Sequence, residues 1–347
     1  MAITDRWLKE PGARVKGSRP LDSSKLQAPG IVRIPTGGFR LFYTAVGPAK
    51  PFPHCQGYIL SAVSDDGLNF HPEAGIRLAP QPAIPHMSLR VLAPSITRAS
   101  DGRWRMYFES RGLASRPTVI CSAVSADMLE WKLEDGIRLQ GSANLGGPRY
   151  LALPDGRGRL HCFSAKRRTG GAAAGVKPAL GVVSAVTADG VNFELEPGYR
   201  LEAGHTEYDA VGITAAEAIP PPAGGGRWTM VFSAWQDVPP GTVVPLHPSV
   251  DPNATDDGLS ENFAKASIAA DLAGYRSRIF VAHSDDGLRW QRGGCLIEGL
   301  GHGREGLDAV HAEDMSVIEI GPGRYRMYYA ACDKNGNWQI ASAITAG

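Results

Sequence analysis

The sequence predicts an all-β protein: one five-bladed β-propeller, spanning residues 1–347, whose blades are four-stranded antiparallel sheets. Three observations lead to this prediction. Two repeated units alternate along the chain, glycine and proline are abundant, and the first segment matches a unit that is missing at the end of the chain. The 42 glycines and 26 prolines favour short strands joined by turns over long helices. Repeated units of this kind are typical of propellers.

One repeated unit reads as a strand, a tight turn, and a second strand that begins with an aromatic residue. Three copies align without a gap and a fourth is weaker: SAVSDDGLNFHPEAGIRL (61–78), SAVSADMLEWKLEDGIRL (122–139), SAVTADGVNFELEPGYRL (184–201) and VAHSDDGLRWQRGGCLIE (281–298). Asp-Gly pairs predict hairpin turns, because glycine takes positive φ and aspartate caps its own turn. We therefore assign the turn aspartates to structure rather than to catalysis: Asp65, Asp66, Asp285 and Asp286.

The other repeated unit precedes the first and reads as two strands around a glycine-centred turn. Its five copies are APGIVRIPTGGFRLFYTA (28–45), APSITRASDGRWRMYFES (93–110), GPRYLALPDGRGRLHCFSA (147–165), AAEAIPPPAGGGRWTMVFSA (215–234) and DMSVIEIGPGRYRMYYAA (314–331). Joined to the first unit, each copy makes one four-stranded antiparallel sheet. Five copies predict five blades.

The two ends of the chain are expected to share a blade. The C-terminal segment NWQIASAITAG (337–347) matches the third strand of a blade, but no fourth strand follows it. The missing strand lies at the other end, where RWLKEPGARV (6–15) matches the fourth strand of the other copies. We therefore expect the N-terminal strand to complete the last blade, which removes two open sheet edges and ties the termini together.

The composition excludes several classes of function. A formal net charge of +1 gives no basic surface for nucleic acid and no acidic tail for a basic partner. No run approaches the roughly 20 apolar residues of a membrane span, and the N-terminal segment has no apolar signal-peptide region. We expect a soluble, cytoplasmic protein that binds neither nucleic acid nor membrane, and its oligomeric state stays open. The cysteines are odd in number and without a CxxC pair, which predicts buried free thiols: Cys55, Cys121, Cys162, Cys295 and Cys332.

The loops that lead into the first strand of each blade carry most of the chemically reactive side chains. They include PAKPFPHCQ, PAIPHMSLR, EAGHTEYDAVG and GHGREGLDAVHAED, whereas the opposite loops are short turns. This asymmetry predicts a ligand site on one face, at the mouth of the central channel. The long insertion at 236–277 combines a Pro- and Asp-rich loop with a short helix capped by Ser260. We interpret it as a lid over the channel, with an oligomer contact as the alternative.

The A-P-x-I and D-G-R-W-R-M-Y-F units resemble the five-bladed glycoside hydrolases that include arabinanases, xylosidases, invertases and levansucrases. That resemblance implies a base or nucleophile in an Asp-Pro pair on the first blade, and a general acid in a Glu-Gly-Pro triplet on a later blade. Here Ala28 occupies the first-blade slot, before Pro29. On the last blade, Glu313 falls in the slot of the general acid, and Asp314 falls in the column of the Asp-Pro aspartate.

Glycoside cleavage needs two carboxyl groups, about 5 Å apart for retention and about 6.5 to 9.5 Å apart for inversion. Adjacent residues on a strand point to opposite faces, so we do not expect Glu313 and Asp314 to pair with each other. We assign Glu313 as the acid. Asp209 or Asp308, which hold matching positions in DAVGITAAEAI and DAVHAEDMSVI, is assigned as the base, with His311 in the same catalytic cluster.

Substrate binding is assigned to side chains around the channel mouth: His86, Arg90, Arg149, His205, Glu207, Trp235, Arg304 and Asp314. Arg90 and Arg149 would bind polar or anionic groups, and Trp235 would stack on a sugar ring. Structural alternatives stay open for several of these residues. Asp209 and Asp308 would then cap the starts of strands, and Arg149 would pair with a carboxylate of a neighbouring blade. Glu217 would plug the channel through a partner arginine.

The sequence leaves three functions open. The first is a glycoside hydrolase-like enzyme that acts on a small carbohydrate ligand by carboxylate acid/base catalysis. The second is a lyase, isomerase or cyclase that uses the histidine and carboxylate cluster, with a divalent metal in the channel as one option; His205, His302 and His311 are its candidate ligands. The third is a non-catalytic sugar-binding propeller. No other cofactor is assigned.

Overall fold

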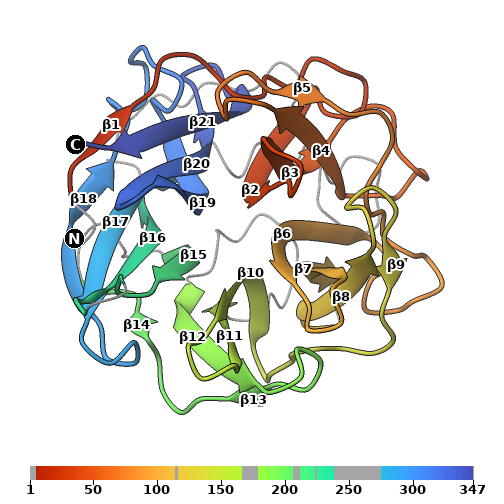
Figure 1. The fold of residues 1–347 in the computed structure, drawn as a ribbon. Helices are drawn as coiled ribbons and strands as arrows, with labels where there is room; N and C mark the ends of the chain where they lie inside the picture. Colours follow the sequence, from red (N-terminus) through yellow and green to blue (C-terminus); the bar gives the residue numbers. More distant parts are fainter. Residues whose placement is uncertain are drawn as a thin grey trace.

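The computed structural model describes residues 5–113, 116–165, 179–205, 212–222, 225–237 and 275–346. These residues form strands arranged around a central axis, and they contain no helix (Figure 1). No helix in this described part is therefore long and apolar enough to cross a membrane. Most of the predicted lid, from 238 to 274, lies outside the described residues, so the lid and its helix stay a prediction.

Three sheets follow one another between residues 25 and 202. Each is antiparallel and takes its strands in sequence order. The first contains β2 (Lys25–Arg33), β3 (Phe39–Val46), β4 (Tyr58–Ser64) and β5 (His71–Pro72). The second contains β6 (Arg90–Arg98), β7 (Trp104–Arg111), β8 (Val119–Ser125) and β9 (Lys132–Leu133). The third contains β10 (Asn144–Ala152), β11 (Gly158–Ala165), β12 (Ala179–Thr187) and β13 (Glu194–Leu195), with β14 (Leu201–Glu202) also on β12.

The remaining strands form two antiparallel groups. One group contains β15 (Gly212–Ile219), β16 (Trp228–Asp237), β17 (Tyr275–Ser284) and β18 (Gln291–Ile297). The other contains β19 (His311–Gly321), β20 (Arg324–Cys332), β21 (Trp338–Thr345) and β1 (Trp7–Lys9). A parallel pairing of Ser277 with His311 joins the two groups. Strand β1 pairs with β21, Trp7 opposite Thr345, which confirms that the N-terminal strand completes the last sheet.

The inner strands close a ring around the axis. Strands β2, β6, β10, β15 and β19 contact one another in that order, and β19 also contacts β2 (Figure 1). Apolar side chains of neighbouring sheets fill the space between them; Phe42 and Ile59 of one sheet pack with Met106 and Phe108 of the next. The start of every inner strand therefore faces the same central space.

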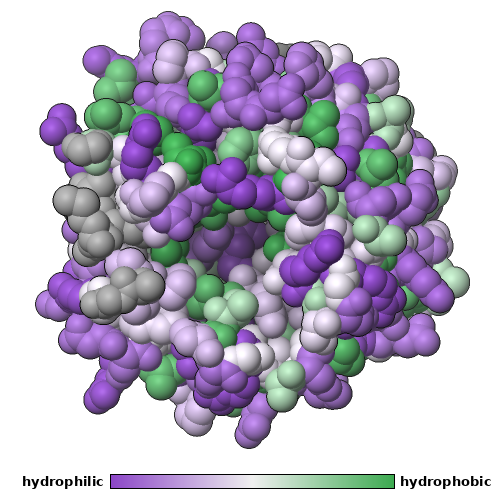
Figure 2. Space-filling model, in the orientation of Figure 1, coloured by the Kyte–Doolittle hydropathy of each residue, from purple (hydrophilic) through white to green (hydrophobic). Residues whose placement is uncertain are grey.

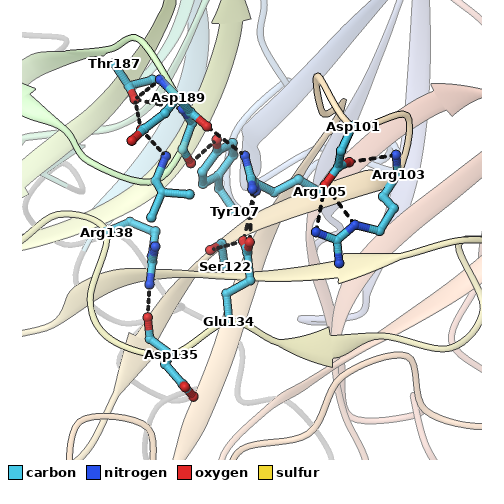
Figure 3. A network of polar contacts seen from close by, with 12 residues as sticks. Asp101, Arg103, Arg105, Tyr107, Ser122, Glu134, Asp135, Arg138, Thr187 and Asp189 are labelled. Atoms are coloured by element: carbon cyan, nitrogen blue, oxygen red, sulfur yellow. Dashed lines mark hydrogen bonds and ion pairs between the residues drawn. The ribbon is translucent and has the colours of Figure 1, made fainter.

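A repeated contact of arginine, glutamate and serine ties most sheets to the next one, and Figure 3 shows the copy at Arg105. Arg105 of β7 donates two hydrogen bonds of 2.9 Å to Glu134, and Ser122 donates a third of 2.7 Å. Arg105 also reaches the carbonyl of Asp189 in the following sheet, at 3.4 Å. Arg40, Arg159 and Arg326 repeat this arrangement. The matching position of β16 holds Thr229, so the seam between β16 and the last sheet lacks this arginine.

Two smaller predictions can be compared with the structure. Asp66 accepts the backbone N–H groups of Leu68 and Asn69 at 2.8 Å, so its structural assignment is confirmed. Asp286 makes the same contacts with the two amides that follow Gly287. All five cysteines are free, as predicted; four are buried, but Cys295 is exposed, so its predicted burial is wrong.

Candidate active site

Every inner strand carries a β-bulge near its start. The register shifts lie between Gln27 and Gly30, Leu92 and Ser95, Gly146 and Arg149, Ile213 and Ala215, and Glu313 and Ser316. At four of these bulges one residue takes a positive φ: Ala28 (49°), Ala93 (53°), Gly147 (56°) and Asp314 (53°). Such a backbone is unusual for alanine and costs free energy. Asp314 thus stands where the other strands have only a methyl group or a hydrogen.

The bulge explains why one sequence-based expectation is wrong. A regular strand would point Glu313 and Asp314 to opposite faces. In the structure both residues line the same cavity. The extra residue of a bulge and the left-handed backbone at Asp314 break the two-residue alternation and re-aim the side chains. The two carboxyl groups of β19 therefore act on the same space.

That cavity has a volume of about 170 Å³ and lies among the starts of the inner strands. The face of the ring shown in Figure 2 has a central hollow with a hydrophilic floor. Six side chains of its wall carry chemical groups that could act on a ligand. Five of them are ionisable and the sixth is an indole: Lys25, Arg90, Glu109, Glu313, Asp314 and Trp235. The sequence predicted a ligand site at this end of the strands, and the cavity lies there.

Glu313 is 4% exposed and is held from two sides. The indole Nε1 of Trp235 donates a hydrogen bond of 2.8 Å to its Oε2. The Ser277 hydroxyl hydrogen-bonds the same carboxyl group. Burial raises the pKa of Glu313, whereas the charge of Lys25 and these two hydrogen bonds lower it. Trp235 thus contacts the predicted acid and lines the cavity in which we expected it to stack on a sugar.

Asp314 is the group best placed to hold a proton. Burial, followed by the nearby charge of Glu313, raises the pKa of Asp314 to about 8, and the cations Arg149 and Lys25 oppose this only in part. Its backbone N–H donates to Ser233 Oγ at 3.3 Å. Burial and the repulsion between the two carboxylates of β19 therefore favour a proton on Asp314 at neutral pH.

Sequence reasoning missed two charged residues of the cavity. Burial raises the pKa of Glu109, although the charge of Arg90 and the N–H of Gly147, at 3.1 Å from Oε2, favour its ionised form. Burial lowers the pKa of Lys25 to about 8 against the attraction of Glu313. The one available signal for Glu109 was a carboxylate inside the otherwise apolar run M-Y-F-E-S. Lys25 gave none, because it precedes the first repeated unit.

The predicted bases do not join the cavity within the described structure. Asp308 is buried, lies 2.6 Å from Lys9 Nζ, and accepts a hydrogen bond of 3.0 Å from Tyr329. These contacts give Asp308 a structural role as an ion-pair and hydrogen-bond partner, and Asp308 is not part of the cavity wall. Asp209 and Glu207 lie outside the described residues, so their roles stay predictions.

Arg149 takes the structural alternative that the sequence had left open. Its buried guanidinium donates to the carbonyls of Pro29, Pro94, Pro148 and Met315, at 3.0 to 3.4 Å. Its Nε also lies 3.4 Å from Glu217. Arg149 therefore links β2, β6, β10 and β19 across the axis, and the assignment to substrate binding is replaced by this role.

The other predicted binding residues divide between the cavity and the surface. Arg90 lines the cavity. His86 does not; it is half-buried, and burial and the charge of Arg116 lower its pKa. His205 is exposed, with Nε2 3.3 Å from Glu202, and Arg304 is exposed. These three residues are therefore not brought to the cavity by the described part of the fold.

The predicted histidine metal site is not assembled. His311 is fully buried, and its Nδ1 lies 2.9 Å from Ser277 Oγ. Among the described residues no group of three or more His, Cys, Asp or Glu side chains is arranged to hold a metal ion. A shared site of His205, His302 and His311 is therefore wrong for this part of the chain.

No protein-family model and no curated protein matches the sequence. A solved structure described as a glycoside hydrolase gives a TM-score of 0.66 at 16% identity, covering 98% of this chain and 93% of that one. A thermostable family-43 glycoside hydrolase gives 0.60 at 12% identity, with 96% and 91% covered. An N-acetylgalactosamine deacetylase from F. plautii, in complex with blood group B trisaccharide, gives 0.63 at 14% identity, with 97% and 95% covered. At these identities the likeness shows the fold alone, and the chain therefore has the fold of glycoside hydrolases and related carbohydrate-active enzymes.

Proposed function

We propose that the protein is a carbohydrate-active enzyme, which cleaves or transfers the glycosyl group of a small glycoside in the central cavity of a five-bladed propeller. The observation that supports this most is the set of three buried carboxyl groups around one cavity: Glu109, Glu313 and Asp314. Glycoside cleavage needs one carboxyl group that is protonated and one that is ionised. The fold is consistent with this function but does not by itself decide it.

The environments of the pair on β19 suggest how the roles divide. Asp314, with a pKa raised to about 8, is protonated at neutral pH and donates its proton to the leaving oxygen. Glu313 accepts hydrogen bonds from Trp235 and Ser277 and faces the charge of Lys25, which favour its carboxylate. It serves as the base that takes a proton from water, or as the nucleophile at the anomeric carbon. The proposed acid is therefore Asp314, whereas the sequence had assigned that role to Glu313.

The rest of the cavity would bind the sugar. Arg90 and Lys25 offer donors to hydroxyl or anionic groups, and the indole of Trp235 offers an apolar face. Glu109 adds a third carboxyl group from β7, and its charge raises the pKa of Asp314 further. A cavity of about 170 Å³ suits one sugar ring better than a long polysaccharide.

The test is a screen of aryl glycosides with wild-type protein and with Glu313→Gln. We expect wild type to release the aryl group from at least one glycoside, and the variant to lower kcat by about 100-fold or more. Arg103→Ala is the control, because Arg103 is exposed, pairs with the exposed Asp101 and lies outside the cavity wall, so it should leave kcat unchanged. No cleavage by wild type, or equal kcat in Glu313→Gln, would refute the proposal. Sugar binding without turnover would favour a non-catalytic propeller instead.

A further inference from the structure

Two buried polar side chains outside the cavity wall connect to Glu313. Ser277 of β17 and His311 of β19 are 1% and 0% exposed. Ser277 Oγ lies 2.9 Å from His311 Nδ1, and the same hydroxyl hydrogen-bonds Glu313. Their backbones form the parallel pair that joins β17 to β19. A continuous hydrogen-bonded path therefore runs from the imidazole through the serine to the carboxyl group in the cavity.

Counting protons leaves two possible arrangements of these hydrogen bonds. A serine hydroxyl has one proton, so Ser277 donates either to Glu313 or to His311 Nδ1. Burial, together with the charges of Lys25 and other nearby cations, lowers the pKa of His311 well below its usual value, so the imidazole is neutral and has one N–H. With that proton on Nδ1, His311 donates to Ser277 and Ser277 donates to Glu313. With the proton on Nε2, Ser277 would donate to His311, and Glu313 would lose a donor.

We infer that Ser277 and His311 are positioning residues: the His311 Nδ1–H turns the Ser277 hydroxyl toward Glu313, which keeps the negative charge on Glu313 and the proton on Asp314. Trp235 Nε1 can only donate, so Glu313 then accepts two hydrogen bonds in its ionised form. The effect on turnover rests on the proposed function, whereas the placement of the proton does not.

The imidazole is held in the orientation that this requires. Its ring stacks on Trp338, with centroids 5.2 Å apart and an angle of 11° between the planes. Lys25 Nζ lies 4.4 Å from the centroid of the Trp338 ring. Stacking on a buried indole fixes the ring plane, and the 2.9 Å contact with Ser277 Oγ places Nδ1 within that plane.

Charged and titratable groups from all the surrounding strands act on this path. The groups that face the two carboxyl groups of Glu313 and Asp314 are Lys25 of β2, Glu109 of β7, Arg149 of β10 and Cys332 of β20. The groups that face His311 are Lys25, His302 and Arg276. Lys25 attracts the charge of Glu313, and Arg149 attracts a charge on Asp314. All of these groups remain when Ser277 is replaced, so that substitution isolates the contribution of the hydroxyl.

The experiment compares Ser277→Ala with Ser277→Thr, which keeps the hydroxyl, in pH profiles of kcat/KM on a cleaved aryl glycoside. Loss of a donor raises the pKa of Glu313, so the acid limb in Ser277→Ala should move up by about one pH unit. Ser277→Thr and the matched control Ser122→Ala should keep the wild-type limb, because Ser122 makes the same contact with Glu134 in another sheet. An unmoved limb in Ser277→Ala, or equal shifts in the alanine and threonine variants, would overturn the inference.

A second measurement needs no substrate and separates this inference from the proposed function. Infrared difference spectra against pH report the C=O stretch of protonated carboxyl groups. We expect a band that titrates above neutral pH and that disappears in Asp314→Asn. In Ser277→Ala, part of its intensity should move to a second band, from the protonated carboxyl group of Glu313. His311→Asn, whose amide can donate from the Nδ1 position, should keep the wild-type band, and His311→Leu should not. Identical titrations in wild type and Ser277→Ala would overturn the inference even if glycosides are cleaved.

Discussion

Asp314→Asn is expected to lower kcat for glycoside cleavage by about 100-fold or more and, at the same time, to stabilise the protein at alkaline pH. The activity falls because asparagine cannot donate the proton. The stability rises because the folded state holds a proton on Asp314 up to pH of about 8, whereas the unfolded chain releases it near 3.8. The folded form therefore loses stability as pH rises through this window, and a side chain that cannot ionise avoids the loss. Asparagine also tolerates the positive φ of 53°.

Calorimetry of wild type and Asp314→Asn at pH 5, 7 and 9 measures this effect. The difference in Tm should favour the variant and should grow with pH. Asp101→Asn is the control, because Asp101 is exposed and pairs with Arg103, so it should give no gain of this kind. A variant that is less stable than wild type at pH 9, or that retains full activity, would contradict the assignment of the proton to Asp314.

Arg149→Met is expected to lower the free energy of unfolding by about 3 to 5 kcal/mol. The substitution removes donors from the carbonyls of Pro29, Pro94 and Met315, on three different sheets. It also leaves the half-buried Glu217 without its cation. Buried polar groups that lose their partners carry the full cost of having left water.

A double-mutant cycle identifies the source of this loss. In urea titrations, Arg149→Met combined with Glu217→Gln should lose less than the sum of the two single losses, because no unpaired charge is left behind. Arg157→Ala serves as the reference, since Arg157 is half exposed and pairs with the equally exposed Asp155; it should change stability by less than about 0.5 kcal/mol. If Arg149→Met costs no more than Arg157→Ala, the link across the axis is unimportant.

The strand order could be predicted from the sequence because each repeated unit buries its apolar face only against its neighbours. The pairing of β1 with β21 follows from the same argument, since an isolated third strand at the C-terminus would leave an open edge. The bulges could not be predicted. Ala28, Ala93 and Asp314 are not residues that signal a positive φ as glycine does, and only the packed ring requires it.

The sequence predicted only part of the candidate site. Glu313 and Asp314 were found because they interrupt a repeat, Trp235 because it ends a strand, and Arg90 because its loop lies at the channel mouth. Glu109 and Ser277 were missed because each lies on a different strand from Glu313. Residue spacing in the sequence does not show which side chains of different strands meet at the site. Arg149 was assigned to substrate although its partners are backbone carbonyls, which a sequence motif does not display.

The most direct test of the proposed chemistry is the rescue of Glu313→Ala by azide on an aryl glycoside that wild type cleaves. The anion takes the place of the missing carboxylate or of the water it activates, attacks the anomeric carbon, and displaces the aryl group. We predict that release of the aryl group by the variant rises with azide concentration, that a glycosyl azide appears in the mass spectrum, and that wild type shows neither effect. A variant that stays inactive and forms no glycosyl azide would contradict a role for Glu313 at the reacting carbon.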